Sequence, residues 1–293
     1  MNKTMHIKPN KSGFTLVELL IVMAITGIVT GAVFTAFKSQ QKSYGVQEQV
    51  VEMQQNLRAG MDLMVREIRM AGYSQGASGF GIIDIQPRNI GNNVDTTIAG
   101  NGSFQFTADL DDNGTLGGNE TISYSVCDFP IITGGDGIND LGRNSGGGRQ
   151  QLAENIQALG FAYAFDANGD GQLDTTGAGN TIWAVDSDGD NDLDVNLDTN
   201  GDGSIDELDG PGAGGNGLIA GTALAADVVP QDIRAVRIWM LARTGRGDDK
   251  FANTHTYTVG SKVITPNTDA DPNNNNLRMR LLETTVKCRN MGL

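Results

Sequence analysis

Near its N-terminus the chain has the sequence Lys11-Ser12-Gly13-Phe14-Thr15-Leu16-Val17-Glu18-Leu19-Leu20, which joins a basic leader to a long apolar run. The run extends over 24 residues from Phe14 to Phe37, and Glu18 is its one charged side chain. A helix that crosses a bilayer needs about 20 mostly apolar residues. An ordinary secretory signal has an apolar core of roughly 7 to 15 residues with the cleavage site behind it. Here Gly13 precedes the run, so cleavage after this glycine would leave the helix on the mature chain.

This segment resembles the class III signal and N-terminal helix of type IV pilins and of type II secretion pseudopilins. The resemblance implies that a prepilin peptidase removes the leader 1–13 by cleaving after Gly13 and methylates the new N-terminus at Phe14. A carboxylate inside hydrocarbon is costly and needs a partner. For Glu18 the resemblance supplies one, the amine of Phe14 on a neighbouring subunit during assembly. The alternative is a charge tolerated close to the membrane interface.

The charge of the leader predicts the orientation of the chain in a membrane. The leader has Lys3, Lys8 and Lys11 and no acid, which favours an N-terminus held in the cytoplasm. We therefore expect a single-pass protein of the inner membrane with its head on the periplasmic side, later found in a pilus or another extracellular filament.

One long helix is predicted over 14–72, with 14–37 in the membrane or the filament core. Proline is absent between Pro9 and Pro87. Beyond the membrane, apolar residues recur at steps of three and four, which predicts a stripe that packs against a globular domain. The stripe consists of Val46, Val50, Met53, Leu57, Met61, Met64 and Ile68. Gly27 and Gly31 allow either close helix packing or local loosening of the helix, and the sequence leaves both open.

Residues 73–293 are expected to form a β-rich head. The chain has 40 glycines among 293 residues, about twice the usual ~7%. Short runs that alternate apolar and polar residues are typical of a half-buried antiparallel sheet. These runs are 103–107, 121–127, 159–165, 181–185, 233–242, 254–259 and 281–289. The predicted fold class is α+β, with the long helix packed on an antiparallel head that has long Gly/Asp-rich loops.

Three further segments, 66–73, 232–243 and 285–290, resemble the PilW family of large minor pilins and its secretion counterpart, the GspJ pseudopilin. The resemblance covers the two ends of the mature chain and hardly touches the middle, from about Gly76 to Pro230. It implies a low-abundance subunit that primes the filament or forms its tip, with other major and minor pilins as partners.

The middle of the chain is strongly acidic. Between Gln150 and Ile233 there are 16 Asp and Glu and not one Lys or Arg. Residues 166–174 and 198–206 share the pattern Asp-x-Asn-x-Asp-Gly-x-aliphatic-Asp, which is the front of an EF-hand-type calcium loop. The second loop has Asp209 at position 12, whereas the first has Gly177 there and must be completed from elsewhere. Residues 186–194 lack the glycine at position 6 but place five aspartates on alternate residues, which would share one face of an extended strand.

A fourth candidate, 109–120, fits the loop signature from Asp109 to Glu120. Flanking helices are not evident in any of the four, so we predict helix-free calcium loops between strands, with 166–209 as an acidic insertion. The candidate ligands are Asp109, Asp111, Asn113, Thr115, Glu120, Asp166, Asn168, Asp170, Gln172, Asp174, Asp186, Asp188, Asp190, Asp192, Asp194, Asp198, Asn200, Asp202, Ser204, Asp206 and Asp209. Magnesium suits these loops less well, because it favours few protein ligands and retains water. The alternative is a flexible acidic insertion without metal.

Cys127 and Cys288 are the two cysteines, and both end strand-like runs. A head outside the cytoplasm lies in a compartment that permits disulfides. We therefore predict a Cys127–Cys288 disulfide, with two separate buried thiols as the alternative.

The remaining motifs point away from an enzyme and from nucleic acid. The chain has two histidines, and His6 lies in the leader, so His255 alone remains for acid–base chemistry. Without the leader the chain has 18 basic and 35 acidic side chains, a net charge of −17, which is the wrong sign for phosphate contacts.

The sequence thus predicts a minor pilin of a type IV pilus with a calcium-stabilised head. Alternatives are a type II secretion minor pseudopilin and, in another class, a calcium-dependent adhesin carried on the pilus. A calcium-dependent hydrolase is the enzyme reading, and no catalytic motif favours it.

Overall fold

The computed structural model describes residues 13–74, 78–85, 103–129, 138–210, 217–266 and 276–292. The chain divides into two compact units, 1–48 and 49–293. Helix α1 (Leu16–Ile68) contributes to both units, since it continues without interruption for 53 residues.

The two parts of α1 have different surroundings. Up to residue 44 its described side chains are exposed, in keeping with an apolar run that has no partner within its own unit. From residue 49 onward α1 belongs to the head, where its stripe is buried from Met53 through Leu57, Met61 and Met64 to Ile68. The helical period predicted for this stripe is therefore confirmed over its second half. Beyond the helix, Gly72 has a φ of +76° and donates its N–H to the carbonyl of Thr107 at 2.9 Å, which ties the end of α1 to the head.

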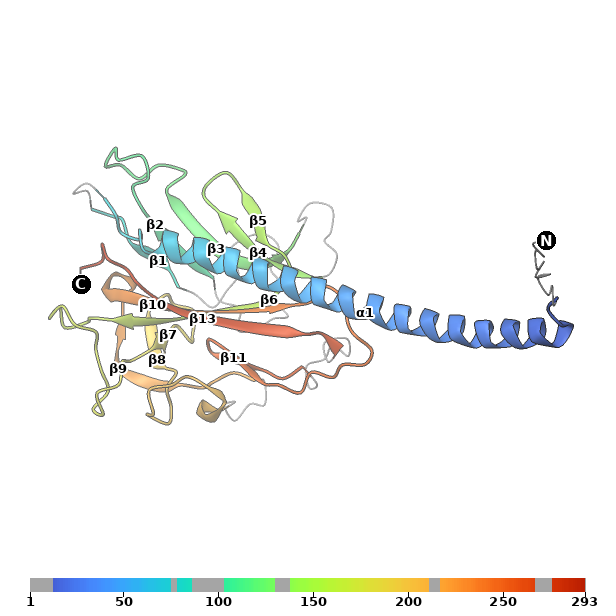
Figure 1. Ribbon diagram of the computed structural model, residues 1–293. Coiled ribbons are helices and arrows are strands. Elements are labelled where there is room, and N and C mark those ends of the chain that lie inside the picture. The colour runs from blue at the N-terminus through green and yellow to red at the C-terminus, as the bar shows by residue number, and fades with distance from the viewer. Residues whose placement is uncertain are drawn as a thin grey trace, which may run out of the picture. The chain divides into compact units, whose positions relative to one another are not determined.

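The head contains two antiparallel sheets and a hairpin (Figure 1). The five-stranded sheet has the order β1-β2-β3-β4-β5. Its strands are β1 (Ile82–Asp84), β2 (Phe104–Thr107), β3 (Thr121–Asp128), β4 (Asn139–Asn144) and β5 (Arg149–Ala153). The six-stranded sheet has the order β13-β10-β6-β7-β8-β9. Its strands are β6 (Ile156–Phe165), β7 (Ala184–Val185), β8 (Leu193–Asn196), β9 (Thr222–Val228), β10 (Ile233–Arg243) and β13 (Met279–Lys287). The separate hairpin pairs β11 (Tyr257–Val259) with β12 (Lys262–Ile264).

The six-stranded sheet is covered on both faces. One face shares a core with α1 and the five-stranded sheet, in which Met64, Phe104, Tyr163 and Met240 are buried. The other face packs under the segments that follow β6 and β8 and under the β11–β12 hairpin. Burial on both faces explains why β6 and β10 are almost continuously buried and lack the alternation of a half-exposed strand.

At one point the hairpin and the sheet approach too closely for any side chain. A Cβ atom added to Gly160 of β6 would lie 2.5 Å from the backbone nitrogen of Gly260, in the turn between β11 and β12. This crossing holds the hairpin directly on the sheet.

A buried polar cluster joins α1 to the five-stranded sheet. The Glu67 carboxylate accepts hydrogen bonds from the Tyr124 hydroxyl of β3 and, at 2.8 Å, from Nε of Arg143 in β4. Burial and the hydrogen bond to Glu67 raise the pKa of Tyr124, so its hydroxyl remains a donor. Arg143 also donates to the Ser145 hydroxyl at 2.9 Å. The cluster fixes how the helix is rotated against the sheet.

Replacing Glu67 with alanine is expected to lower the free energy of unfolding by about 3 kcal/mol, because it leaves the half-buried Arg143 guanidinium without its carboxylate. The side chains of Arg143 and Glu67 are only 18% and 11% exposed, so solvent screens the pair weakly. Urea unfolding of the full chain in detergent measures the loss. Glu52→Ala, at an exposed site on the same helix, is the matched control and should change stability by less than about 0.5 kcal/mol. Equal effects of the two variants would contradict a structural role for the cluster.

Candidate functional site

The N-terminal end of α1 is closed by a capping box. The Thr15 hydroxyl accepts the N–H of Glu18 at 3.3 Å, and the Glu18 carboxylate accepts the N–H of Thr15 at 3.1 Å. This reciprocal arrangement satisfies two of the free N–H groups at the start of the helix. Gly13 and Phe14 lie just before it and are exposed, Phe14 to 87%. Glu18 therefore has a local function in the single chain, which the sequence analysis did not foresee.

The rest of the predicted leader, residues 1–12, lies outside the described residues. Among those described, α1 is the one helix long and apolar enough to cross a membrane. Its apolar segment begins directly behind the predicted cleavage site, as expected for a helix that stays on the mature chain.

Four acidic loops connect strands of the head. Loop 109–120 joins β2 to β3, loop 166–174 follows β6, and loop 186–194 joins β7 to β8. Loop 198–209 follows β8 and ends in the short 3₁₀ turn η1 (Glu207–Asp209). No α-helix flanks any of them within the described residues. Each loop is a turn next to a strand, and each begins at a buried aspartate.

The first aspartate of every loop, at position 1, is buried, and its carboxylate accepts a hydrogen bond from the backbone N–H of the residue at position 6. Each of these carboxylates accepts the N–H of position 6 at 2.8–3.0 Å. The pairs are Asp109 with Gly114, Asp166 with Gly171, Asp186 with Asn191 and Asp198 with Gly203. In each loop the side chain at position 3 also accepts the N–H of position 5, and the side chain at position 5 accepts that of position 7.

The backbone of the four loops repeats as well. Position 4 has a positive φ in all four, at Asp112 (58°), Gly169 (72°), Gly189 (86°) and Gly201 (76°). Position 6 does too, at Gly114 (69°), Gly171 (82°), Asn191 (78°) and Gly203 (86°). Asparagine tolerates this left-handed conformation better than most residues. Asn191 thus takes the place of the glycine.

This geometry corrects the sequence analysis of 186–194. Residues 186–192 form a loop of the same conformation as the other three, and the extended strand β8 begins only at Leu193. The five aspartates therefore do not share one strand face. The signal that could have identified the loop is asparagine at position 6, because asparagine also adopts the positive φ that glycine has in the other loops.

The loops are closed in two ways. In 109–120 and 198–209 the acid at position 12 accepts the N–H of position 2: Glu120 from Leu110 at 2.9 Å and Asp209 from Thr199 at 2.7 Å. In 166–174 and 186–194 the acid at position 9 takes that role: Asp174 from Ala167 at 2.9 Å and Asp194 from Ser187 at 2.8 Å. Loop 166–174 is thus closed by its own Asp174 and does not depend on position 12.

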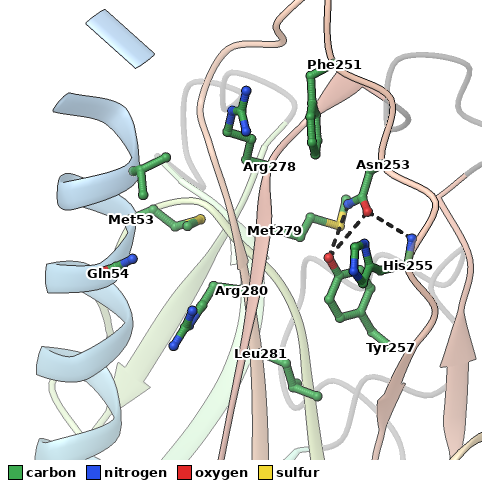
Figure 2. Close-up of a pocket in the computed structure, with 11 residues that line it drawn as sticks. Met53, Gln54, Phe251, Asn253, His255, Tyr257, Arg278, Met279, Arg280 and Leu281 are labelled. Atoms are coloured by element: carbon green, nitrogen blue, oxygen red, sulfur yellow. Dashed lines mark hydrogen bonds between the residues drawn. The ribbon is translucent and has the colours of Figure 1, made fainter. Parts of the chain in front are cut away.

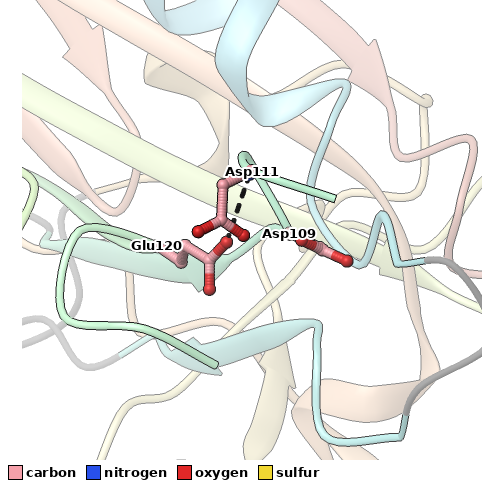
Figure 3. Close-up of side chains that lie close together, drawn as sticks. All are labelled: Asp109, Asp111 and Glu120. Atoms are coloured by element: carbon pink, nitrogen blue, oxygen red, sulfur yellow. Dashed lines mark hydrogen bonds between the residues drawn. The ribbon is translucent and has the colours of Figure 1, made fainter. Parts of the chain in front are cut away.

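Carboxylate oxygens converge in two of the loops. One oxygen from each of Asp109, Asp111 and Glu120 lies within 4.8 Å of the others (Figure 3), and the same holds for Asp186, Asp188 and Asp190. Burial raises the pKa of Asp186, and the charges of Asp190 and Asp188 add to the rise. The N–H groups of Gly117, Leu110 and Asp111 hold the pKa of Glu120 below its usual value. Oxygen-rich clusters of this kind suit a hard divalent cation.

The remaining predicted ligands divide between these loops and neighbouring turns. Position 7 is held by Thr115, Gln172, Asp192 and Ser204, each of which donates its N–H to position 5. Such a residue would offer a cation its backbone carbonyl. Asp206 caps η1 by accepting the N–H of Leu208 at 2.7 Å.

The structure does not form the predicted disulfide, and both cysteines are free, buried thiols. Cys127 lies in the five-stranded sheet beside Gly142 and Arg149. Cys288 follows β13 in the core shared with α1, and its N–H donates to the carbonyl of Arg234 at 2.8 Å. Burial raises the pKa of Cys288 to about 12 and that of Cys127 as well, so both remain protonated. The alternative of two separate thiols is the arrangement that the structure has.

Comparison with known proteins bears on the N-terminal segment. A family model described as the prokaryotic N-terminal methylation motif matches residues 8–34. A solved type IV-like pilin from Thermus thermophilus is similar over 82% of this chain and 97% of that chain, with 15% sequence identity and a TM-score of 0.37. No curated protein matches the sequence. The matched range includes Gly13, Phe14 and Glu18, so the N-terminal segment of the chain contains a prokaryotic N-terminal methylation motif.

Proposed function

We propose that this chain is a minor pilin of a type IV pilus, of the PilW kind, that helps to prime the filament or to form its tip. The observation that carries the proposal is the N-terminal segment, in which a methylation motif over residues 8–34 covers Gly13, Phe14 and the start of an exposed apolar helix. An exposed apolar face of this length needs a membrane or other helices to cover it. Other pilins would cover it in the filament and the inner membrane before assembly. In this role the chain is a structural subunit and not an enzyme.

Mass spectrometry of the protein isolated from cells tests the processing step. We expect the mature chain to begin with N-methylated Phe14, and we expect deletion of the prepilin peptidase to leave residues 1–13 attached. Gly13→Ala should also retain the leader, whereas Ser12→Ala, one residue before the cleavage site, should be processed normally. A mature N-terminus elsewhere would contradict the proposal.

Co-isolation separates a pilus from a secretion pseudopilus. A tagged chain recovered from sheared surface filaments together with pilus minor pilins supports the proposal. Recovery with type II secretion components, and absence from surface filaments, would assign the chain to the pseudopilin alternative.

We further propose that the head binds Ca²⁺ in the acidic loops. Support comes from the shared conformation of the four loops, in which buried aspartates at position 1 are held by backbone N–H groups. Asp109, Asp111 and Glu120 in one loop and Asp186, Asp188 and Asp190 in another would supply charge and oxygen donors together. The cation would offset the repulsion among these carboxylates and link the loops to the strands that bear them.

Asp198→Ala combined with Asp202→Ala is expected to remove one calcium ion per chain, because positions 1 and 5 supply two of the carboxylates of that loop. Equilibrium dialysis with the full chain in detergent measures the ion count. Asp202→Ala alone, at an exposed position, guards against misfolding and should weaken binding at least tenfold. Glu207→Ala is the matched control, an exposed acid of the same loop outside the proposed ligand set. An unchanged ion count in the double variant would make this loop an acidic linker.

A further inference from the structure

Strand β13 forms one edge of the six-stranded sheet. It pairs with β10 over its whole length, from Ala235 opposite Lys287 to Arg243 opposite Met279. In an antiparallel ladder, alternate residues direct their N–H and C=O groups toward the neighbouring strand and the others away from it. On the outer side of β13, no described residue hydrogen-bonds to these backbone groups. A long edge with free backbone groups is a template for another strand.

A groove lies along the first part of this edge (Figure 2). Its volume is about 450 Å³. Val50, Met53 and Gln54 of α1 line one side, and Phe251, Asn253 and Tyr257 line the other. Met279, Arg280 and Leu281 of β13 contribute the edge itself. The groove is therefore open to an extended chain, with a helical wall on one side and an aromatic wall on the other.

The two arginines of the groove differ in whether their guanidinium groups already have a partner. Arg278 is paired with Asp248 at 3.2 Å and lies over the ring of Phe251 at 4.2 Å. Arg280, by contrast, is exposed, and its guanidinium has no partner among the described residues. Arg280 thus leaves a cation with five donors available beside the free edge.

The charge of this edge is opposite to that of the chain. Residues 276–292 contain four basic side chains, Arg278, Arg280, Lys287 and Arg289. Their one acid, Glu283, is paired with Arg237 at 2.5 Å. The whole chain has 35 acidic and 21 basic side chains. A ligand with negative charge is therefore attracted to this edge and repelled by the loops elsewhere.

We propose that the outer edge of β13 binds an extended acidic segment of another polypeptide, which adds a strand to the six-stranded sheet. The backbone of the segment pairs with β13, as in other cases of strand addition. Because successive side chains of a strand point to opposite faces, one carboxylate of the segment pairs with Arg280 on the α1 face of β13. Its apolar side chains lie on the other face, beside Leu281, Phe251 and Tyr257. This binding site includes neither the apolar segment 14–37 of α1 nor the acidic loops, and it does not depend on either proposed function.

Fluorescence anisotropy with the mature full chain in detergent tests the proposal. The probe is a labelled nine-residue peptide of alternating valine and glutamate. We expect it to bind, and we expect a valine–lysine peptide to bind at least tenfold more weakly. A valine–glutamate peptide with N-methylated backbone at alternate residues should also lose at least tenfold, because it cannot form the ladder.

Variants of the chain test whether Arg280 contributes to peptide binding. Arg280→Glu should weaken binding of the valine–glutamate peptide at least tenfold. Arg58→Glu, an equal change at an exposed site of α1 outside the groove, should alter it less than twofold. Hydrogen exchange adds a readout of strand pairing, since amides of β13 should exchange more slowly with the peptide bound.

Three results would overturn the proposal. Unchanged affinity in Arg280→Glu would remove the guanidinium from the site. Equal binding of the N-methylated peptide would exclude strand pairing. Dimerisation of the chain that Arg280→Glu abolishes, without peptide binding, would assign the edge to a second copy of this chain.

Discussion

Chelation of divalent cations with EDTA is expected to lower the melting temperature of the head by roughly 5–10 °C for each calcium site that it empties. A ligand at 100 times its Kd stabilises the folded state by about 2.7 kcal/mol. For a domain of this size, 1 kcal/mol corresponds to about 2–4 °C. Circular dichroism of the full chain in detergent, scanned with EDTA and again after calcium is restored, measures the shift.

The physical reason lies in the crowding of the loops. Asp186, Asp188 and Asp190 bring carboxylate oxygens within 4.8 Å of one another, and no basic residue stands between Gln150 and Ile233 to offset them. If the loops bind calcium as proposed, the ion would replace this repulsion with attraction. Because Asp186, Asp166 and Asp198 are buried at the ends of strands, the gain acts on the sheet and not only on the surface.

Two controls distinguish specific binding from general screening. Sodium chloride at matched ionic strength screens exposed charges and should restore only a small part of the lost melting temperature. Magnesium at the same concentration should restore less than calcium, because it favours few protein ligands and retains its water. Equal recovery with sodium chloride would show that the loops are acidic surface without a metal site.

The long helix and the longest strands of the two sheets were predictable, because their sequences contain the signal that folds them. The proline-free run and the spacing from Met53 to Ile68 predict α1 and its buried face. Strands β3, β6, β10 and β13 are long, rich in apolar or β-branched residues, and lie where the sequence predicts them.

Other strands form through their partners and could not be predicted in this way. Strand β4 has the sequence Asn-Asp-Leu-Gly-Arg-Asn, and β5 has Arg-Gln-Gln-Leu-Ala, neither of which favours a strand by itself. They extend the ladder that β3 begins. The short β12 and the alanine-rich β9 likewise form because each pairs with a neighbouring strand, β12 with β11 and β9 with β8.

The acidic loops were predictable in part, since spacing identifies ligands but not backbone conformation. The pattern with glycine at position 6 located three loops, and asparagine at this position concealed the fourth as a strand-like run. The closing acid at position 9 was also missed, because the EF-hand pattern directs attention to position 12. For the cysteines, two residues permit only one pairing, but the sequence does not show that Cys127 lies in β3 of the five-stranded sheet while Cys288 follows β13 of the six-stranded sheet.

Glu18→Gln is expected to reduce incorporation of the chain into filaments at least tenfold while leaving leader cleavage and membrane insertion intact. Glutamine keeps an oxygen that can accept the N–H of Thr15, so it preserves the capping box. It removes the negative charge that would pair with the Phe14 amine of a neighbouring subunit. In hydrocarbon an unpaired charge is costly, which makes such a pair a strong determinant of register.

The capping box makes a matched control available on the same turn. Thr15→Ala removes the hydroxyl that accepts the N–H of Glu18 and keeps the carboxylate. If the charge of Glu18 sets the register, Thr15→Ala should enter filaments nearly as well as the unmodified chain. Immunoblots of sheared filaments and of the inner membrane measure how each variant is distributed.

The two variants separate the roles of Glu18 in the free chain and in the filament. Similar losses in Glu18→Gln and Thr15→Ala would mean that assembly depends on an intact helix cap. Normal incorporation of Glu18→Gln would remove the charge from assembly altogether, and the carboxylate would then serve as a cap alone. A loss confined to Glu18→Gln is the result expected, because a capping hydrogen bond contributes about 1 kcal/mol and an unpaired charge in a membrane helix costs several times more.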